Sequence, residues 1–223
     1  YYPFTGNAND SSGNGNHGTV IGAKLTTDRN GNFNSAYDFN GITDVINVPH
    51  SKSLDITKDI TLCAWINVEP KSLPYLGRIV LKNYGVNRWI IYGMFHGTSN
   101  NISVQLDDIT DSNTVYLKSI DNIVKKNRWQ FLVSTWDGDS LRLYVNCDLV
   151  KTIYTKNDGI FSNLSPVTIG NSDNPEIVTG INGKIDDVRI YNRALNKKEI
   201  TTLCTFDYIT LNEGVVLIKP NPT

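Results

Sequence analysis

The sequence predicts an all-β fold made of two packed sheets. Short apolar or alternating runs recur along its 223 residues, and they are rich in Val, Ile, Tyr and Trp, which favour strands. Clusters of Gly, Asn, Asp and Pro separate these runs, as expected for tight turns. Roughly a dozen strands at this spacing favour a β-sandwich.

Each expected strand is one such run bounded by turn residues. In chain order they are Ala36–Asn40, Val45–Val48, Thr61–Val68, Arg78–Lys82, Arg88–Phe95, Ile102–Leu106, Thr114–Lys118, Trp129–Trp136, Leu141–Asn146, Val150–Tyr154, Val167–Gly170 and Ile185–Tyr191. The segment 136–140 is expected to be a hairpin turn, because its Asp-Gly pair supplies the backbone freedom that such turns need.

The one good helix signal is the segment Asn196–Leu203. Asn196 is the expected N-cap, and Glu199 stands three residues later, where a capping box places its acidic residue. We therefore expect one short helix near the end of the chain.

Length and charge restrict the function classes. A chain of this length fits one large all-β domain or two small ones. It can bury about 70% of its unfolded surface, so its core needs no disulfide or metal to be stable. The formal net charge of −1 argues against a nucleic-acid partner, which needs a basic face. No apolar run approaches the roughly 18 residues of a membrane span.

Three cysteines stand at wide spacings and form no metal-ligand pattern. Cys63 lies in an apolar run, so we expect a buried free thiol. Cys147 and Cys204 could pair in an exported protein, but sequence alone gives no distance between them. That pairing stays open at this point.

Two motifs at opposite ends of the chain carry a family resemblance. Residues 1–18 read Tyr-Tyr-Pro-Phe-Thr-Gly-Asn-Ala-Asn-Asp-Ser-Ser-Gly-Asn-Gly-Asn-His-Gly, and residues 182–196 contain Ile-Asp-Asp-Val-Arg-Ile-Tyr. Together they resemble the laminin-G-like, concanavalin A-like domains of secreted bacterial proteins, over residues 1–205. The resemblance implies one antiparallel jelly-roll β-sandwich at the cell surface or outside the cell.

Residues 206–223 are expected to form a linker that leads into another domain. The ending Pro-Asn-Pro-Thr resembles the start of the C-terminal sorting domain that type IX secretion systems read. The alternative is a stiff proline linker. We expect the chain to be part of a longer protein, because it begins at Tyr1 with neither Met nor signal peptide.

The N-terminal motif also predicts a metal site. The run 10–18 sets short oxygen-bearing side chains between glycines, which let several carbonyls face one point, as calcium requires. The resemblance implies a structural calcium held by the carboxylates of Asp10 and Asp186 and by the main-chain oxygens of Ser12, Gly15 and His17. The alternative is a turn in which Asp10 caps backbone amides and Asp186 is hydrogen-bonded without metal.

Catalysis is not expected. Glycosidases on such sandwiches pair carboxylates on one strand face, but Glu69, Glu176, Glu199 and Glu213 are isolated. Adjacent aspartates at 107 and 108 point to opposite faces. The sequence contains no nucleophile elbow, zincin helix, phosphate loop or dinucleotide motif.

A ligand is expected on one face of the sheet. If the apolar residues of Ile102–Leu106 point inward, Ser103, Gln105 and Asp107 line the opposite face, where aromatic rings could stack on sugars. The predicted ligand residues are Tyr84, Trp89, Tyr92, His96, Gln105 and Asp107. The alternative for the aromatic residues is that they fill the core or cover sheet edges.

We therefore expect a non-catalytic, lectin-like module that binds a glycan or polysaccharide and contains a structural calcium. The alternatives are a protein-binding adhesion domain, a spacer without ligand and, last, a glycoside hydrolase. The sequence departs from the family pattern at Cys147, where the hairpin usually has Gly, and at Val45 and Ile181, where Tyr and Phe are usual. These departures put the hairpin's conformation and any inherited ligand preference in doubt.

Overall fold

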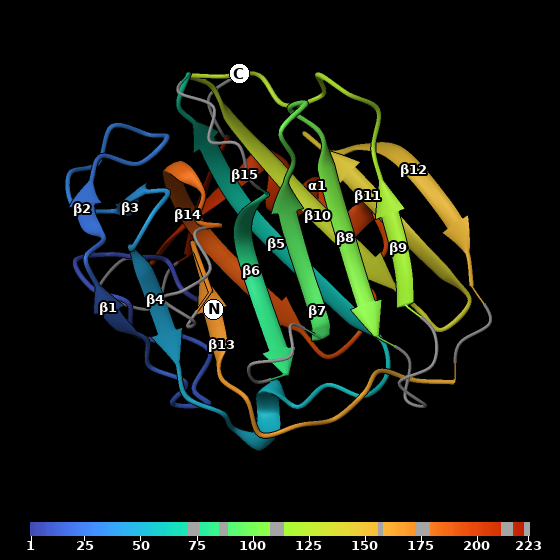
Figure 1. Ribbon diagram of the computed structural model, residues 1–223. Helices are drawn as coiled ribbons and strands as arrows, with labels where there is room; N and C mark the ends of the chain where they lie inside the picture. The colour runs from blue at the N-terminus through green and yellow to red at the C-terminus, as the bar shows by residue number, and fades with distance from the viewer. Residues whose placement is uncertain are drawn as a thin grey trace.

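A computed structural model shows two antiparallel sheets packed face to face, which confirms the predicted jelly-roll β-sandwich (Figure 1). The structure describes residues 1–70, 76–84, 89–107, 114–155, 158–172, 179–210 and 216–220, with the backbone alone for Tyr84, Trp89 and everything after residue 205. Within this part of the chain, one α-helix accompanies the strands.

One seven-stranded sheet, called here the β7 sheet, has the order β1-β4-β13-β6-β7-β8-β9. Its strands are β1 (Thr19–Ile21), β4 (Val45–Val48), β13 (Val167–Ile169), β6 (Gly77–Tyr84), β7 (Trp89–His96), β8 (Ile102–Asp107) and β9 (Thr114–Lys118). The second, called the β5 sheet, also has seven strands in the order β12-β11-β10-β5-β14-β3-β2. Its strands are β12 (Asp148–Tyr154), β11 (Ser140–Val145), β10 (Trp129–Trp136), β5 (Ile60–Val68), β14 (Asn182–Tyr191), β3 (Ala36–Asn40) and β2 (Lys24–Thr26).

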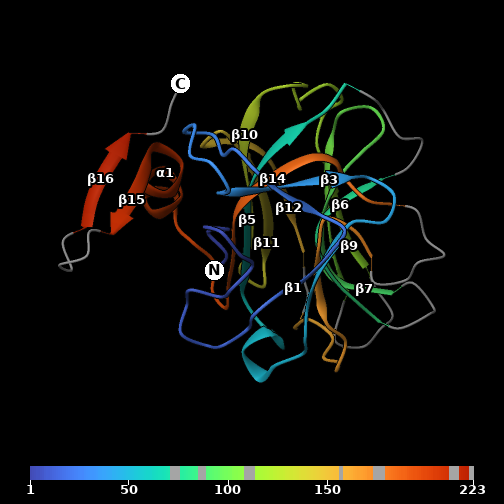
Figure 2. The ribbon, with the colours of Figure 1, turned by 90° about the vertical axis from the view of Figure 1, so that its left-hand side faces the viewer.

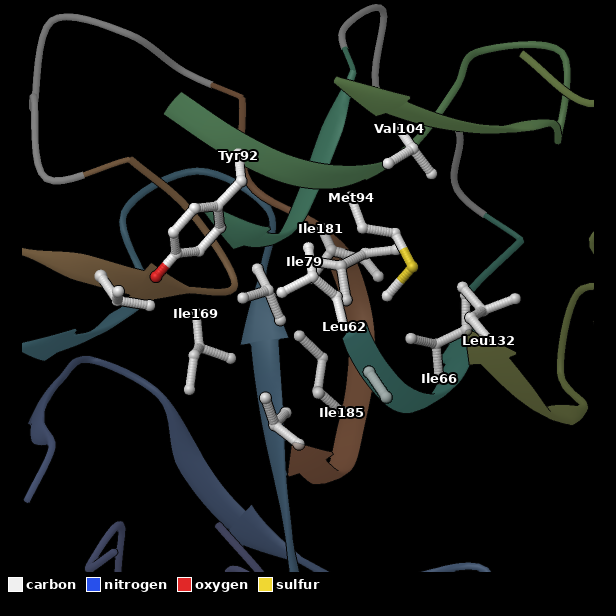
Figure 3. Close-up of a cluster of buried hydrophobic side chains, with 14 of the residues drawn as sticks. Leu62, Ile66, Ile79, Tyr92, Met94, Val104, Leu132, Ile169, Ile181 and Ile185 are labelled. Atoms are coloured by element: carbon white, nitrogen blue, oxygen red, sulfur yellow. The ribbon is translucent and has the colours of Figure 1, made fainter. Parts of the chain in front are cut away.

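The core lies between the sheets because apolar side chains alternate inward along both. Figure 3 shows Leu62, Ile66 and Ile185 of the β5 sheet facing Ile79, Met94 and Val104 of the β7 sheet. This inward alternation leaves every second residue of a strand on an outer face. The outer faces of the two sheets carry different side chains, which are described in turn below.

The helix α1 (Lys197–Thr205) covers the outer face of the β5 sheet (Figure 2). Its Ile200 and Cys204 join a second apolar cluster with Cys63, Trp65 and Phe131. The predicted capping box is confirmed, since the Glu199 amide donates to Asn196 Oδ1 at 3.0 Å. The Asn196 amide in turn donates to Glu199 Oε2 at 2.8 Å.

A disulfide joins Cys147 to Cys204 and fastens α1 to the β11–β12 hairpin. The hairpin turn is Asn146-Cys147, and both residues have a positive φ, 49° and 69°. Hairpin turns of this length favour that conformation, and Gly adopts it most easily. The hairpin is therefore kept although Cys147 stands where the family has Gly. Cys63 is a buried free thiol, as predicted.

The N-terminus is tied to the last strand of the sandwich. Tyr2 forms an antiparallel bridge with Val188, with its amide 2.8 Å from the Val188 carbonyl. At this point β14 is bulged, and its pairing with β5 skips from Asp186 to Arg189. Asp187 has a φ of 53°, and the bulge brings it beside Asp186.

Four strands were not among the predicted ones. β1 and β2 have three residues each, too few to show alternation in the sequence. β15 (Phe206–Thr210) and β16 (Val216–Pro220) pair only with each other, within the predicted linker. The residues after 220 and the start of the predicted strand at Arg88 lie outside the described part of the chain.

Candidate functional site

A row of side chains crosses the outer face of the β7 sheet. Cross-strand partners point to the same side of a sheet, so the strand registers identify the row. Thr19 pairs with Asn47, Asn47 with Thr168, and Thr168 with Leu81. From there the row continues through Gly93, Gln105 and Tyr116. Except for Leu81 and Gly93, its members are uncharged polar residues.

Three hydroxyl or amide oxygens on this face have no hydrogen-bond partner among the described residues. They are Asn47 Oδ1, Thr168 Oγ1 and Ser103 Oγ, and each atom is buried. Ser103 belongs to the same face because it pairs with Phe95 and Lys118 in a neighbouring row. Most buried polar atoms in proteins are satisfied, so a group of exceptions on one sheet face calls for an explanation.

Apolar groups occupy the middle of the row. A Cβ added at Gly93 would lie 2.6 Å from Phe95 Cζ and 3.2 Å from Leu81 Cδ1, so the aromatic ring lies over the bare glycine backbone. Tyr116, at the end of the row, leaves 50% of its surface exposed. The face thus combines an apolar centre, an exposed aromatic residue and neutral polar groups.

The predicted ligand residues divide between the two sides of the sheet. Gln105 and Asp107 lie on the outer face, as predicted, since Ile102, Val104 and Leu106 are in the core. Asp107 is buried and accepts a hydrogen bond from Thr114 Oγ1 at 2.9 Å. It therefore contributes a buried carboxylate that is hydrogen-bonded within the sheet.

Tyr92 and His96 lie on the opposite side, which corrects their placement with the ligand residues. Tyr92 pairs with Leu106 and His96 with Ile102, both of which are core residues. Tyr92 is fully buried, and its hydroxyl donates to the Leu54 carbonyl at 3.0 Å. Burial lowers the pKa of His96 to about 4, although a side-chain hydrogen bond with Asn100 acts to raise it. Their side of the sheet depends on the pairing of β7 with β8, which could not be read from the sequence.

Tyr84 and Trp89 are the two remaining predicted ligand residues. Their backbone pairs in the β6–β7 hairpin, and their side chains lie outside the described structure. Asn47, Thr168 and Tyr116 were missed. Each occupies a polar place in an alternating strand, but only the strand order shows that they share a face with Gln105.

The residues predicted to hold calcium form two separate hydrogen-bonded groups. Both oxygens of Asp10 are engaged: Oδ1 accepts from the Tyr1 amino group and the Ser12 amide, and Oδ2 from the Ser12 hydroxyl and the Asn16 amide, all within 3.0 Å. Burial opposes ionisation, but the hydrogen bonds from Ser12, Tyr1 and Asn16 lower the pKa of Asp10 to about 2.

The rest of the N-terminal loop is also hydrogen-bonded within the chain. His17 Nδ1 accepts a hydrogen bond from the Asp10 amide at 3.2 Å. The Gly15 carbonyl accepts one from the His17 amide at 2.9 Å. Asp186 instead contacts the Arg29 guanidinium. Among the described residues, no three His, Cys, Asp or Glu side chains gather as a metal site would require. As arranged, Asp10 and Asp186 do not fit a shared calcium ion.

Asp186 and Asp187 belong to a buried cluster of charged groups. Burial raises the pKa of Asp186, and the adjacent Arg29 opposes that rise. Burial acts in the same direction on Asp187, but Arg189 and Arg29 together hold its pKa below the ordinary value. The cluster lies on the β5 sheet, away from the polar row.

Comparison with known proteins agrees with this architecture. A family model described as the concanavalin A-like lectin/glucanases superfamily matches residues 40–201. No curated protein sequence matches the chain. Within the residues that the structure describes, no helix has the length and apolar character needed to cross a membrane.

Several solved binding domains of clostridial toxins share the fold. The binding domain of Paraclostridial Mosquitocidal Protein 1 superposes with a TM-score of 0.71 at 21% identity, over 88% of our chain and 49% of that chain. The receptor-binding domain of botulinum neurotoxin D gives a TM-score of 0.65 at 18% identity, over 88% and 49%. A botulinum neurotoxin serotype D ligand-binding domain, solved in complex with N-acetylneuraminic acid, gives 0.67 at 16% identity, over 88% and 47%.

The chain thus spans about half the length of these structures, and at such identities they establish the fold alone. The family model covers most of the chain, including the strands β4 to β14 that form the greater part of both sheets. The chain belongs to the concanavalin A-like lectin/glucanases superfamily.

Proposed function

We propose that the chain is a non-catalytic carbohydrate-binding module that binds a glycan on the outer face of the β7 sheet. The observation that carries this proposal is the row of polar side chains on one face, in which Asn47 and Gln105 are partly exposed and the Tyr116 ring is half exposed. Sugar hydroxyls donate and accept hydrogen bonds, so a glycan can pair with the partly exposed amide groups of Asn47 and Gln105.

The chemistry of the polar row suits a sugar. Gln105 and Asn47 are neutral hydrogen-bonding groups, and the exposed Tyr116 ring offers a flat apolar surface with a polar end. Within the described strands of the β7 sheet, Asp107 is the one carboxylate, and its Oδ1 accepts a hydrogen bond from Thr114. A single bound carboxylate does not supply the pair that glycoside hydrolysis requires.

Two further observations support the wider setting. The similar neurotoxin D domain was solved with N-acetylneuraminic acid, a sugar, although our chain matches only part of that protein. The disulfide between Cys147 and Cys204 suits an oxidising compartment. We therefore propose that the module works on the cell surface or outside the cell.

The test begins with a glycan array of the folded chain, run with calcium and with chelator. Asn47→Ala and Gln105→Ala then remove the two partly exposed amide groups of the row. Each should weaken binding of the best array glycan by roughly 2- to 10-fold, the worth of one hydrogen bond.

The matched control pair is Tyr116→Ala and Tyr154→Ala. Both tyrosines are exposed, but Tyr154 lies on β12 of the other sheet. Only Tyr116→Ala should weaken retention. An array without hits, or equal binding by all four variants, would reject this face and favour a protein-binding adhesion domain or a spacer.

A further inference from the structure

The bulge in β14 brings two buried carboxyl groups and two guanidinium groups together. Arg29 contacts Asp186 through Nη1 and lies 2.8 Å from Asp187 Oδ2 through Nη2. Arg189 Nη2 lies 3.1 Å from the other oxygen of Asp187. The side chains of Arg29 and Asp186 are 5% and 3% exposed, so this is an interior cluster.

The fold holds Arg29 in place from two sides. Its guanidinium carbon lies 4.7 Å from the centre of the Trp65 ring, a cation–π arrangement. On the other side, Asp28 Oδ1 accepts the amides of Asn30 and Asn32 at 2.8 Å, which fixes the turn that carries Arg29. The guanidinium is thus a built part of the site, with a bidentate geometry that lysine lacks.

The charges in the cluster already balance. With both carboxyl groups ionised, the two aspartates and two arginines sum to zero, and with Asp186 protonated the sum is positive. Asp28 lies nearby, but its carboxylate already accepts hydrogen bonds from Asn30 and Asn32 in its own turn. A divalent cation would therefore meet no net negative charge unless Arg29 moved away.

We propose that Arg29 takes the place of the structural calcium that the family resemblance implies at Asp186. It ties the last strand of the sandwich to the 28–32 turn by an internal cation. The chain then keeps its fold and any ligand binding without calcium. This inference is independent of the proposed glycan function, since it concerns the opposite sheet.

The first test is a thermal melt of the chain in 5 mM calcium and in chelator. We expect equal melting temperatures. A calcium site with a Kd near 10 μM would instead raise the melting temperature by roughly 7–15 °C in a chain of this size. A rise of that kind, removed by Asp186→Asn, would overturn the proposal.

The second test removes the guanidinium. Arg29→Ala should lower the melting temperature by roughly 6–15 °C, because it leaves buried carboxyl groups without a counter-ion. Adding Asp186→Asn should recover part of that loss. Arg142→Ala is the control: its ion pair with Asp137 is partly exposed, so a shift of roughly 0–4 °C is expected.

If Arg29→Ala does not fold, Arg29→Lys tests the same contact. Lysine keeps the positive charge but lacks the two terminal NH groups that reach both aspartates. A smaller loss of melting temperature in Arg29→Lys than in an Arg29→Met variant supports the counter-ion role. An unchanged melting temperature in Arg29→Ala, or no recovery on adding Asp186→Asn, would overturn it.

Discussion

Asp10 illustrates how a single side chain organises the N-terminal loop. Its carboxylate collects four donors from Tyr1, Ser12 and Asn16, and its side chain has no exposed surface. A carboxylate that accepts this many hydrogen bonds is stabilised in its ionised form. Its pKa falls from the ordinary 3.8 to about 2, although burial alone would raise it.

This lowered pKa predicts a pH dependence of stability. Asp10 stabilises the fold above pH 4, and the contribution disappears as the pH falls from about 4 to about 2. Asp10→Asn should therefore cost on the order of 2 kcal/mol at pH 7 and almost nothing near pH 2. Urea unfolding at both pH values measures the difference.

The exposed Asp59, which has no hydrogen bond in the described structure, provides the control Asp59→Asn. That variant should match the parent at both pH values. A loss in Asp10→Asn that stays the same from pH 7 to pH 2 would show that the effect is not electrostatic.

Sequence reasoning went furthest for residues whose role depends on near neighbours. The alternation of Ile102–Leu106 placed Gln105 and Asp107 on the outer face, and the motif around Asn196 gave the helix cap. It went wrong for Tyr92, whose environment is set by pairing with Leu106 on another strand. No local pattern could assign Arg29 to Asp186, because the two lie 157 residues apart.

At the scale of elements, the strands were predicted well and their order was not. The predicted runs from Ala36 onward correspond to strands, because the apolar pattern of a strand is visible within each run of the sequence. The neighbours of a strand depend on loop paths that one sequence does not specify. Hence Asn47, Thr168 and Gln105 could not be recognised as one row before the topology was known.

The attachment of α1 to the β5 sheet also belongs to this scale. Apolar contacts of Ile200 and Cys204 hold the helix on Cys63 and Trp65, and the Cys147–Cys204 disulfide closes a loop of 57 residues. Closing a loop of that length removes unfolded-state entropy worth about 4 kcal/mol in the chain-entropy model.

Reduction of the disulfide should therefore lower the stability of the chain by about 4 kcal/mol, or the melting temperature by roughly 8–15 °C. Denaturation with and without dithiothreitol measures this change. Cys147→Ser/Cys204→Ser should match the reduced parent and lose its response to the reductant.

Cys63→Ala is the control, since Cys63 is buried and unpaired. It should respond to dithiothreitol as the parent does. Reduced and oxidised parent proteins that unfold at the same denaturant concentration would show that apolar contacts alone hold α1 in place.

For the whole molecule, the sandwich and the final β-ribbon are separate sheets. Among the described strands, β15 and β16 are hydrogen-bonded to each other and to no strand of the two large sheets. The domain limit at residue 205 is a prediction that truncation tests.

A chain that ends at Thr205 should melt within roughly 2 °C of the full chain, because its sheets and disulfide stay complete. A chain that ends at Asn196 loses α1 and Cys204 and should melt at least as low as the reduced parent. A large loss in the first truncation would place the 206–220 ribbon inside the domain.

The pairing of β5 with β14 has a consequence for how the protein is made. Eight of the nine residues of β5 are buried in the finished sheet, yet one of its two partner strands is the last of the sandwich to leave the ribosome. At ordinary translation speeds, roughly 6–20 s pass between the synthesis of Val68 and that of Asn182. During that interval an apolar strand has one unpaired edge, which can pair with a wrong strand until β14 has been synthesised.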